Sequence, residues 1–348
     1  MGDTTYQEIE NPQELLDING CIIREGWARR PLFHYDRSLI SVPVIKTKEW
    51  ERFIIADDTA KWLIVASINN IASRMGYSIT YVDYESRKVF NVIHKQKAND
   101  KNRLSQSSRI DDEHNYSCPD MRLALIRRAN VRNVMLCAPR FEVCEAEKGI
   151  DARFMLRQDP YAQSFVTAES MSNSRKSFLL NEIISLIPVS GIFRRGNVTE
   201  QIKPDSVHAV IDWGRGRFSV RPMFKALFSN GKIGLSMLTR NCCAVALDGK
   251  IHLIEDVSTK FTEGGFNAKS KDGRLEISLK DGILQQRSSA LQTFGCLQGS
   301  LTLENGRTIT FSNMPGVSWR VSKHPSTLEK QTSGVRIKTL DSGSDHLD

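Results

Sequence analysis

Residues 300–311 read Ser-Leu-Thr-Leu-Glu-Asn-Gly-Arg-Thr-Ile-Thr-Phe, two alternating segments on either side of Asn305-Gly306. Alternation of apolar and polar residues places every second side chain on the same face of a strand. Asn-Gly tolerates the positive φ angles that tight hairpin turns need. This stretch therefore predicts an antiparallel β-hairpin with one buried face.

The same pattern recurs along the chain before this hairpin. Asp272-Gly273 precedes an alternating segment at 275–279, and Asp248-Gly249 marks another turn. In the first half, apolar segments at 52–56 and 61–67 flank Asp57-Asp58. Short strands with tight turns over more than 300 residues are typical of β-barrels and β-sandwiches.

One helix and one boundary interrupt this pattern. The helix is predicted to begin near Arg221-Pro222 and to run to Phe228, with proline in its first turn. A polar stretch at 169–177 predicts a boundary, and 348 residues are enough for two domains. We therefore expect an all-β protein with few short helices. Its parts are an N-terminal β-barrel at 18–170, a C-terminal β-barrel at 178–326 and a disordered tail at 327–348.

Composition excludes several classes of protein. Hydrophobic residues make up 40% of the chain and charged residues 25%, which is typical of globular proteins. No apolar run approaches the roughly 20 residues that span a bilayer. The polar N-terminus has no secretory signal, so a cytoplasmic location is expected.

The net charge of +8 is unevenly distributed. Residues 201–250 hold eight basic and three acidic side chains, which gives +5 in that window alone. A basic patch can collect nucleic acid or anionic lipid, but a solvated basic face is the commoner reason for such a window. No known nucleic-acid-binding motif is present, and we expect no nucleic-acid partner.

Cysteine and histidine spacing predicts no metal site. The seven cysteines, at positions 21, 118, 137, 144, 242, 243 and 296, form no C-x-x-C pair. His94 and the other histidines in strand-like segments are expected to be structural. Reduced, buried thiols are the expected state without a secretory signal.

The most unusual segment is Ala-Val-Ile-Asp-Trp-Gly-Arg-Gly at 209–216. A buried strand ends in an acid, an aromatic residue and an arginine between two glycines, which permit close approach of a ligand. Asp212 and Arg215 are candidates to pair with each other, or Arg215 could hold an anion with its fork of donors.

Further segments accompany this motif along the chain, and their order and spacing matter more than any one of them. They are Gly26-Trp27-Ala28-Arg29-Arg30-Pro31-Leu32, Lys48-Glu49-Trp50, Leu186-Ile187-Pro188-Val189-Ser190-Gly191, Ile233-Gly234-Leu235, Thr239-Arg240-Asn241, Leu247-Asp248-Gly249-Lys250-Ile251-His252, Phe294-Gly295 with Gly299, and Gly316 with Trp319. Over about residues 18–322 this order resembles the family called domain of unknown function 2804.

The resemblance implies a fold and a class of activity. The family is distantly similar to proteins built from two lipocalin-like β-barrels, among them carotenoid hydratases, tocopherol cyclases and fungal Diels–Alderases. Those proteins handle apolar small molecules without a redox cofactor, in a cavity in or between the barrels. The resemblance therefore implies a cofactor-independent cyclase, isomerase or hydratase.

Asp212 and Arg215 are the catalytic candidates. Asp212 is expected to donate a proton if burial raises its pKa, and Arg215 or Arg221 is expected to orient it or to hold a polar end of the substrate. Trp213, Phe218 and Trp319 are expected to wall the pocket. The substrate-binding set is completed by residues from the motifs: Trp27, Arg29, Arg30, Asn241 and Gln292.

Three alternatives remain open at this stage. Asp212 and Arg215 could form a buried pair that only pins the junction between the barrels. A carrier that binds a lipid-like molecule without chemistry fits a barrel equally well. Arg240, Leu291, Val317, Ser318 and Ile183 favour this reading, because they stand where the family usually has other residues. A nucleic-acid or membrane-surface binder is the third.

Overall fold

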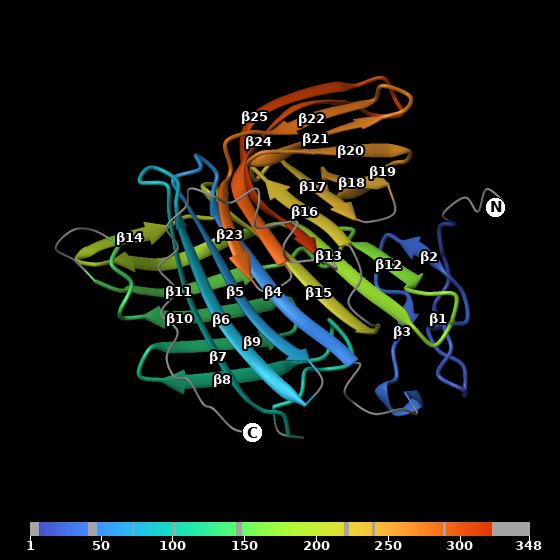
Figure 1. The fold of residues 1–348 in the computed structure, drawn as a ribbon, viewed down its shortest axis with the longest axis horizontal. Helices are drawn as coiled ribbons and strands as arrows, with labels where there is room; N and C mark the ends of the chain where they lie inside the picture. The colour runs from blue at the N-terminus through green and yellow to red at the C-terminus, as the bar shows by residue number, and fades with distance from the viewer. Residues whose placement is uncertain are drawn as a thin grey trace.

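The predicted hairpins assemble into two antiparallel sheets, each curled toward a barrel (Figure 1). The structure is a computed structural model. It describes residues 7–40, 47–71, 73–99, 102–143, 148–218, 223–238, 241–287 and 290–321. The predicted tail at 327–348 lies outside these residues. The described part contains one short 3₁₀ helix at Arg37–Leu39 and no helix long and apolar enough to cross a membrane.

The first sheet contains 13 strands. Along its main path lie β7 (Lys88–Lys97), β6 (Arg74–Asp83), β5 (Trp62–Ile71), β4 (Thr47–Asp57), β15 (Val207–Arg217), β13 (Phe178–Arg195), β11 (Ile150–Arg157), β10 (Val131–Ala138), β9 (Met121–Arg128) and β8 (Asp112–Cys118). Off this path, β12 (Phe165–Ser170) joins β13 to β2 (Gly26–Ala28), and β14 (Val198–Ile202) pairs with β13. Two short strands, β1 (Gln13–Glu14) and β3 (Phe33–His34), pair with each other.

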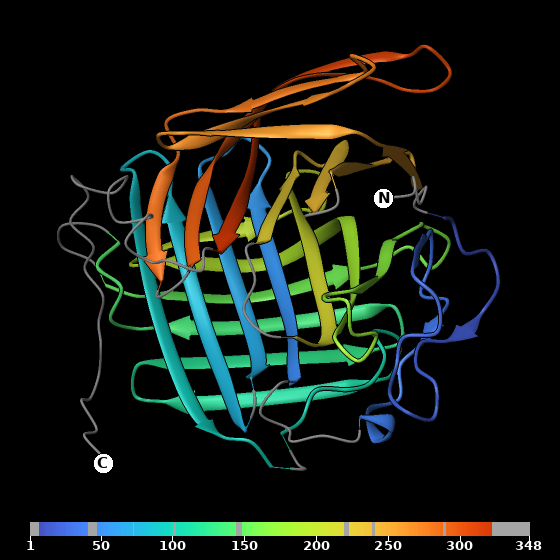
Figure 2. The same ribbon diagram turned by 45° about the vertical axis from the view of Figure 1, so that its right-hand side comes forward.

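The second sheet contains 10 strands and sits across one side of the first (Figure 2). Its path runs through β19 (Lys250–Ile254), β18 (Cys242–Leu247), β17 (Ile233–Leu238), β16 (Met223–Ser229), β25 (Thr308–Val321), β24 (Ala290–Thr302), β22 (Leu275–Leu279), β21 (Gly265–Ser270) and β20 (Val257–Thr262), with β23 (Ile283–Arg287) on β24.

The sequence placed the boundary between the sheets too early. Strands β13, β14 and β15 lie beyond residue 178, yet they belong to the first sheet. The change from one sheet to the other comes between Arg217 and Met223. The physical reason is that β13 pairs with β11, β12, β14 and β15, so it joins the two halves of the first sheet.

The predicted helix near 221–228 is also wrong, because residues Met223–Ser229 form strand β16. Arg221 and Pro222 lie outside the described residues. The side chains of β16 alternate: Ala226 and Phe228 pack inside the second sheet, whereas Leu227 packs between the two sheets. Both faces of this strand are buried, so its sequence shows no simple alternation of polarity.

Three apolar clusters explain how the sheets hold together. One fills the first sheet, around Trp62, Phe154 and Phe193. A second fills the second sheet, around Phe228 and Phe266. The third cluster includes Leu227. It lies between the sheets and joins strands of both. Burial of apolar surface on both faces of β15 and β16 therefore fixes the position of the segment that carries Asp212.

Candidate functional site

Strand β15 places Asp212 and Arg215 on opposite faces, so the predicted pair between them does not form. Successive side chains of a strand alternate, and residues three apart therefore face opposite sides. Asp212 faces the second sheet, beside Arg52 of β4. Arg215 faces the interior of the first sheet, where its ion-pair partner is Glu51 at 2.8 Å.

Asp212 is fully buried and accepts four hydrogen bonds from side chains. Its Oδ1 accepts from Trp50 Nε1 at 2.9 Å, Asn181 Nδ2 at 2.9 Å and Lys225 Nζ at 2.8 Å. Its Oδ2 accepts from Arg52 Nη1 at 2.9 Å. Lys225 comes from β16 of the second sheet, so this carboxylate connects the two sheets.

These neighbours keep the carboxylate ionised. Burial alone would raise the pKa of Asp212, but the positive charges of Lys225 and Arg52 and the hydrogen bonds outweigh it and lower the pKa to about 2. The expectation of a raised pKa is therefore not met, and Asp212 carries no proton to donate at neutral pH. For Lys225, burial lowers the pKa, and attraction to Asp212 acts against that lowering.

Aromatic rings line the open edge of this cluster. The Arg52 guanidinium lies 5.2 Å from the ring centroid of Trp50 and 5.4 Å from that of Trp319. Lys225 Nζ lies 5.2 Å from the Trp50 centroid. The side chain of Arg52 is 26% exposed, whereas that of Asp212 is fully buried. Arg52 is therefore the part of the cluster that an incoming molecule reaches first.

Two buried polar atoms beside the cluster make no hydrogen bond to the described residues. Lys225, Trp319 and Gln292 are neighbours across β16, β25 and β24, and Gln292 Oε1 is unpaired. On the first sheet, Thr167 lies beside Asn181, and Thr167 Oγ1 is also unpaired. Buried polar groups are nearly always satisfied, so these atoms mark places where a bound molecule or water would be held.

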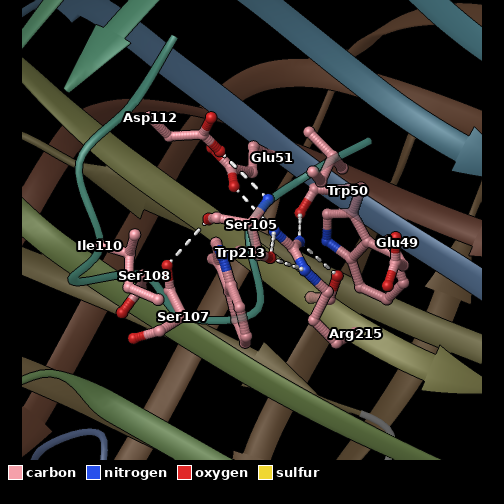
Figure 3. A network of polar contacts seen from close by, with 12 residues as sticks. Glu49, Trp50, Glu51, Ser105, Ser107, Ser108, Ile110, Asp112, Trp213 and Arg215 are labelled. Carbon is pink, nitrogen blue, oxygen red and sulfur yellow. Dashed lines mark hydrogen bonds and ion pairs between the residues drawn. The ribbon is translucent and has the colours of Figure 1, made fainter. Parts of the chain in front are cut away.

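Arg215, on the other face of β15, holds a loop over the barrel interior (Figure 3). Its guanidinium donates two bonds to the Ser105 carbonyl, at 2.8 and 2.6 Å, and one to Trp50 O at 3.0 Å. Trp213 packs against it, with its ring centroid 4.2 Å from the guanidinium carbon. Arg215 is therefore part of the closed wall of the first barrel.

The other predicted residues are spread over the molecule. Arg29 is half-buried, pairs with Glu8 at 2.7 Å and lies over the Trp27 ring, whereas Arg30 is exposed. Phe218 packs in a small cluster with Trp50. Asn241 is exposed, and its backbone accepts a bond from Val257. Arg221 lies outside the described residues.

Trp319 and Gln292 are the predicted binding residues that lie in the second sheet near Asp212. Sequence reasoning missed Arg52, Asn181 and Lys225, because their separation along the chain hides their contact. One signal was available: Lys225 is the single charge in the apolar run 223–228. A lone lysine on a strand with both faces buried needs an acidic partner.

Gly214 of the motif is required by the indole of Trp50. A Cβ at position 214 would lie 2.2 Å from two ring atoms of Trp50. Gly214→Ala should therefore push the indole away from Asp212 and destabilise the protein by about 1–3 kcal/mol. Urea denaturation measures this loss. Gly76→Ala is the matched control, because its Cβ would meet nothing closer than 3.9 Å. Equal midpoints for the two variants would contradict this packing.

Two cavities of the described residues lie elsewhere than the enclosed compartment expected beside Asp212. A groove of about 570 Å³ runs between the sheets, lined by the β13 bulge at 184–188, the 157–163 connection and the turn between β18 and β19. A cavity of about 20 Å³ lies in the first barrel beneath the loop that Arg215 holds. Neither has Asp212 in its lining.

Comparison with solved structures returns several chains at low sequence identity. An AttH-like protein from Nitrosomonas europaea is 12% identical, with 82% of this chain and 96% of that chain covered and a TM-score of 0.47. Kievitone hydratase from Nectria haematococca is 8% identical, with coverage of 84% and 94% and a TM-score of 0.49. CghA with Sch210972 is 9% identical, with coverage of 80% and 89% and a TM-score of 0.40. No curated protein matches the chain.

The family comparison covers nearly the whole chain. Residues 6–324 match the family described as Domain of unknown function (DUF2804). This is the family that the ordered motifs from Gly26 to Trp319 resembled, and the match confirms that prediction. The chain belongs to the DUF2804 family.

Proposed function

We propose that the protein is a cofactor-independent enzyme of the cyclase, isomerase or hydratase type, acting on an apolar small molecule at the junction of the two sheets. The observation that carries the proposal is the buried Asp212–Lys225–Arg52 cluster. Taking charges out of water costs several kcal/mol per ion, and apolar packing would join the sheets at less cost. A buried ion cluster at such a junction is a candidate for chemistry.

Lys225 is the proton carrier in this proposal, in place of Asp212. Two of its three N–H bonds go to Asn181 Oδ1 at 2.6 Å and Asp212 Oδ1 at 2.8 Å. Among the described residues Lys225 makes no third hydrogen bond, so in this proposal the third N–H binds the substrate. Burial lowers the pKa of Lys225, and a proton donor works best when its pKa lies near the operating pH. Isomerisation then needs one proton given to the substrate and one taken back.

Arg52 and the two tryptophans supply the remaining functions. One N–H of the Arg52 guanidinium is bound by Asp212, and the other donors can hold a carbonyl or enolate oxygen. Trp50 and Trp319 already lie against the cationic Arg52. The same ring faces would stabilise positive charge that develops on a substrate. Asp212 and Arg215 differ in this scheme: Asp212 positions Lys225, and Arg215 supports the wall behind it.

A carrier of a lipid-like molecule is the second candidate, and the groove between the sheets favours it. Its volume of about 570 Å³ lies within the roughly 300–1,000 Å³ of small-molecule sites. Apolar side chains of the β13 bulge, including Ile184, Leu186 and Ile187, form part of its lining. Arg157 and Lys250 line the same groove together with Asp159, which leaves a net positive charge for an acidic head group.

The proposal is tested on the molecule that co-purifies with the full chain, identified by mass spectrometry. Incubated with fresh protein in D₂O, an enzyme substrate should gain deuterium or convert to a new product. General acid–base catalysis contributes about 10²–10⁴-fold, so Lys225→Met should lower the rate at least about a hundredfold. Lys48→Met is the control, because Lys48 is half-buried over Phe218 and outside the cluster. A molecule recovered unchanged and bound equally by all three proteins would favour the carrier.

A further inference from the structure

The first sheet does not close completely, and three potential metal ligands lie at the resulting seam. Strands β7 and β8 are the two ends of its main path, and no ladder joins them among the described residues. The stacked rings of Tyr77 and Tyr116, with centroids 4.3 Å apart, cross this seam. His94 on β7 lies there too, facing the turn at Cys118–Asp120 that joins β8 to β9.

From these positions we propose that His94, Cys118 and Asp120 bind a transition-metal ion such as Zn²⁺. One potential ligand atom from each residue lies within 4.8 Å of the other two. Imidazole, thiolate and carboxylate are all ligands of Zn²⁺, and three protein ligands leave a fourth position open. The sites proposed above do not use any of these residues.

The distance between His94 and Asp120 fits two ligands of one metal ion better than it fits a hydrogen bond. His94 Nε2 and Asp120 Oδ2 are 3.5 Å apart. Two ligands bound at about 2.1 Å with a tetrahedral angle lie about 3.4 Å apart. A good hydrogen bond would be shorter, at roughly 2.7–3.2 Å. His94 Nε2 is buried and makes no hydrogen bond to the described residues, so its lone pair or proton has no satisfactory partner.

The remaining geometry needs only a small adjustment. A Zn²⁺-bound sulfur and nitrogen lie about 3.6 Å apart, so separations of up to 4.8 Å within the trio exceed that value by no more than about 1.2 Å. Rotation of the half-buried Cys118 side chain can supply that difference. Arg140 Nη1 forms an ion pair with Asp120 Oδ1 at 2.6 Å, without hydrogen-bond geometry, while Oδ2 faces His94. Such outer contacts commonly orient metal ligands.

A metal ion at this place would connect the two ends of the sheet. His94 belongs to one end strand, and Cys118 and Asp120 to the turn after the other. An ion that binds only the folded chain stabilises it by mass action. Binding would also release the Cys118 proton, because the thiolate is the ligand. The ion would therefore act as a clip across the seam of the first barrel.

The test is titration of the metal-free full chain with Co²⁺ and Zn²⁺. We expect one equivalent of Co²⁺ to produce a sulfur-to-cobalt charge-transfer band, and Zn²⁺ to displace it and raise the melting temperature. Cys118→Ser and His94→Ala should each lose the band and the thermal shift. Arg140→Met should keep the band but weaken binding about tenfold or more, as expected for an outer contact.

Cys21→Ser is the matched control, since Cys21 is also half-buried and lies outside the seam. It should bind Co²⁺ as the unaltered protein does. The proposal is overturned if no band appears in the unaltered protein, or if Cys118→Ser keeps it. It is equally overturned if Cys21→Ser loses the band as fully as Cys118→Ser does. Circular dichroism of each variant separates loss of ligand from loss of fold.

Discussion

Asp212→Leu is expected to destabilise the folded protein by about 3–5 kcal/mol, because it removes one partner of a buried ion cluster. Lys225 would lose its counter-charge and would either stay charged at a buried position or give up its proton, and both cost stability; Asn181 Oδ1 is its remaining described acceptor. The indole N–H of Trp50 and the amide of Asn181 would each lose an acceptor. The midpoint of urea denaturation, followed by tryptophan fluorescence, measures this change.

The double variant Asp212→Leu/Lys225→Met separates the charge effect from a packing effect. Methionine keeps the length of the lysine side chain without its charge, and replacing a whole buried pair by apolar residues is often neutral. Arg52 is partly exposed and can turn toward water. We therefore expect the double variant to be more stable than Asp212→Leu alone. If the two losses simply add, the cluster does not act as a unit and Lys225 is not held by Asp212.

The hairpins could be predicted from the sequence because each is a local signal. Asn305-Gly306 and Asp272-Gly273 lie in the turns between β24 and β25 and between β21 and β22. Gly306 and Gly273 adopt positive φ angles of 81° and 77°, the conformation for which glycine is suited. A turn depends on four consecutive residues, so no knowledge of distant contacts is needed. The all-β class and the two barrel-like sheets follow from these turns.

Strand β16 shows where local signals fail. Met223–Ser229 is apolar except for Lys225 and Ser229, and a short apolar run cannot be assigned to helix or strand by periodicity. Its strand conformation follows from pairing with β17 and β25 on either side. Those partners lie close in sequence on one side but about 90 residues away on the other, and that second contact is invisible to a local pattern.

Only part of the candidate site could be predicted from the sequence. Asp212 was identified from its unusual surroundings, but the expected pair with Arg215 overlooked that residues three apart on a strand face opposite sides. The partners of Asp212 were not predictable, because Trp50, Arg52 and Lys225 meet it only after two sheets have packed together. The pKa could not be predicted either, since burial alone raises it and only the unseen cations reverse the sign.

Arg215→Met is the other variant for which a large effect is expected, and its effect should have a local as well as a global part. The guanidinium is fully buried and donates to Ser105 O, Trp50 O, Gly214 O and the carboxylate of Glu51. Methionine fills a similar volume and satisfies none of these acceptors. Losing the partner of an enclosed carboxylate costs about 3–5 kcal/mol, so the urea midpoint should fall markedly.

The local part concerns the loop at 102–111, which the arginine fastens to the first barrel. With Arg215 gone, the loop keeps other anchors, among them bonds from Arg37 Nη2 to Leu104 O at 2.5 Å, from Arg132 Nη2 to Ser108 O at 3.2 Å and from Ser105 N–H to the Asp112 carboxylate at 3.1 Å. Amide hydrogens of this loop should therefore gain more in exchange rate than those of β16 and β25, whose exchange reflects only the global loss of stability. Arg109→Met, on the exposed side of the same loop, should leave both stability and exchange unaltered. If exchange in the loop and in both sheets became faster by the same factor, Arg215 would support the whole fold and would not anchor this loop in particular.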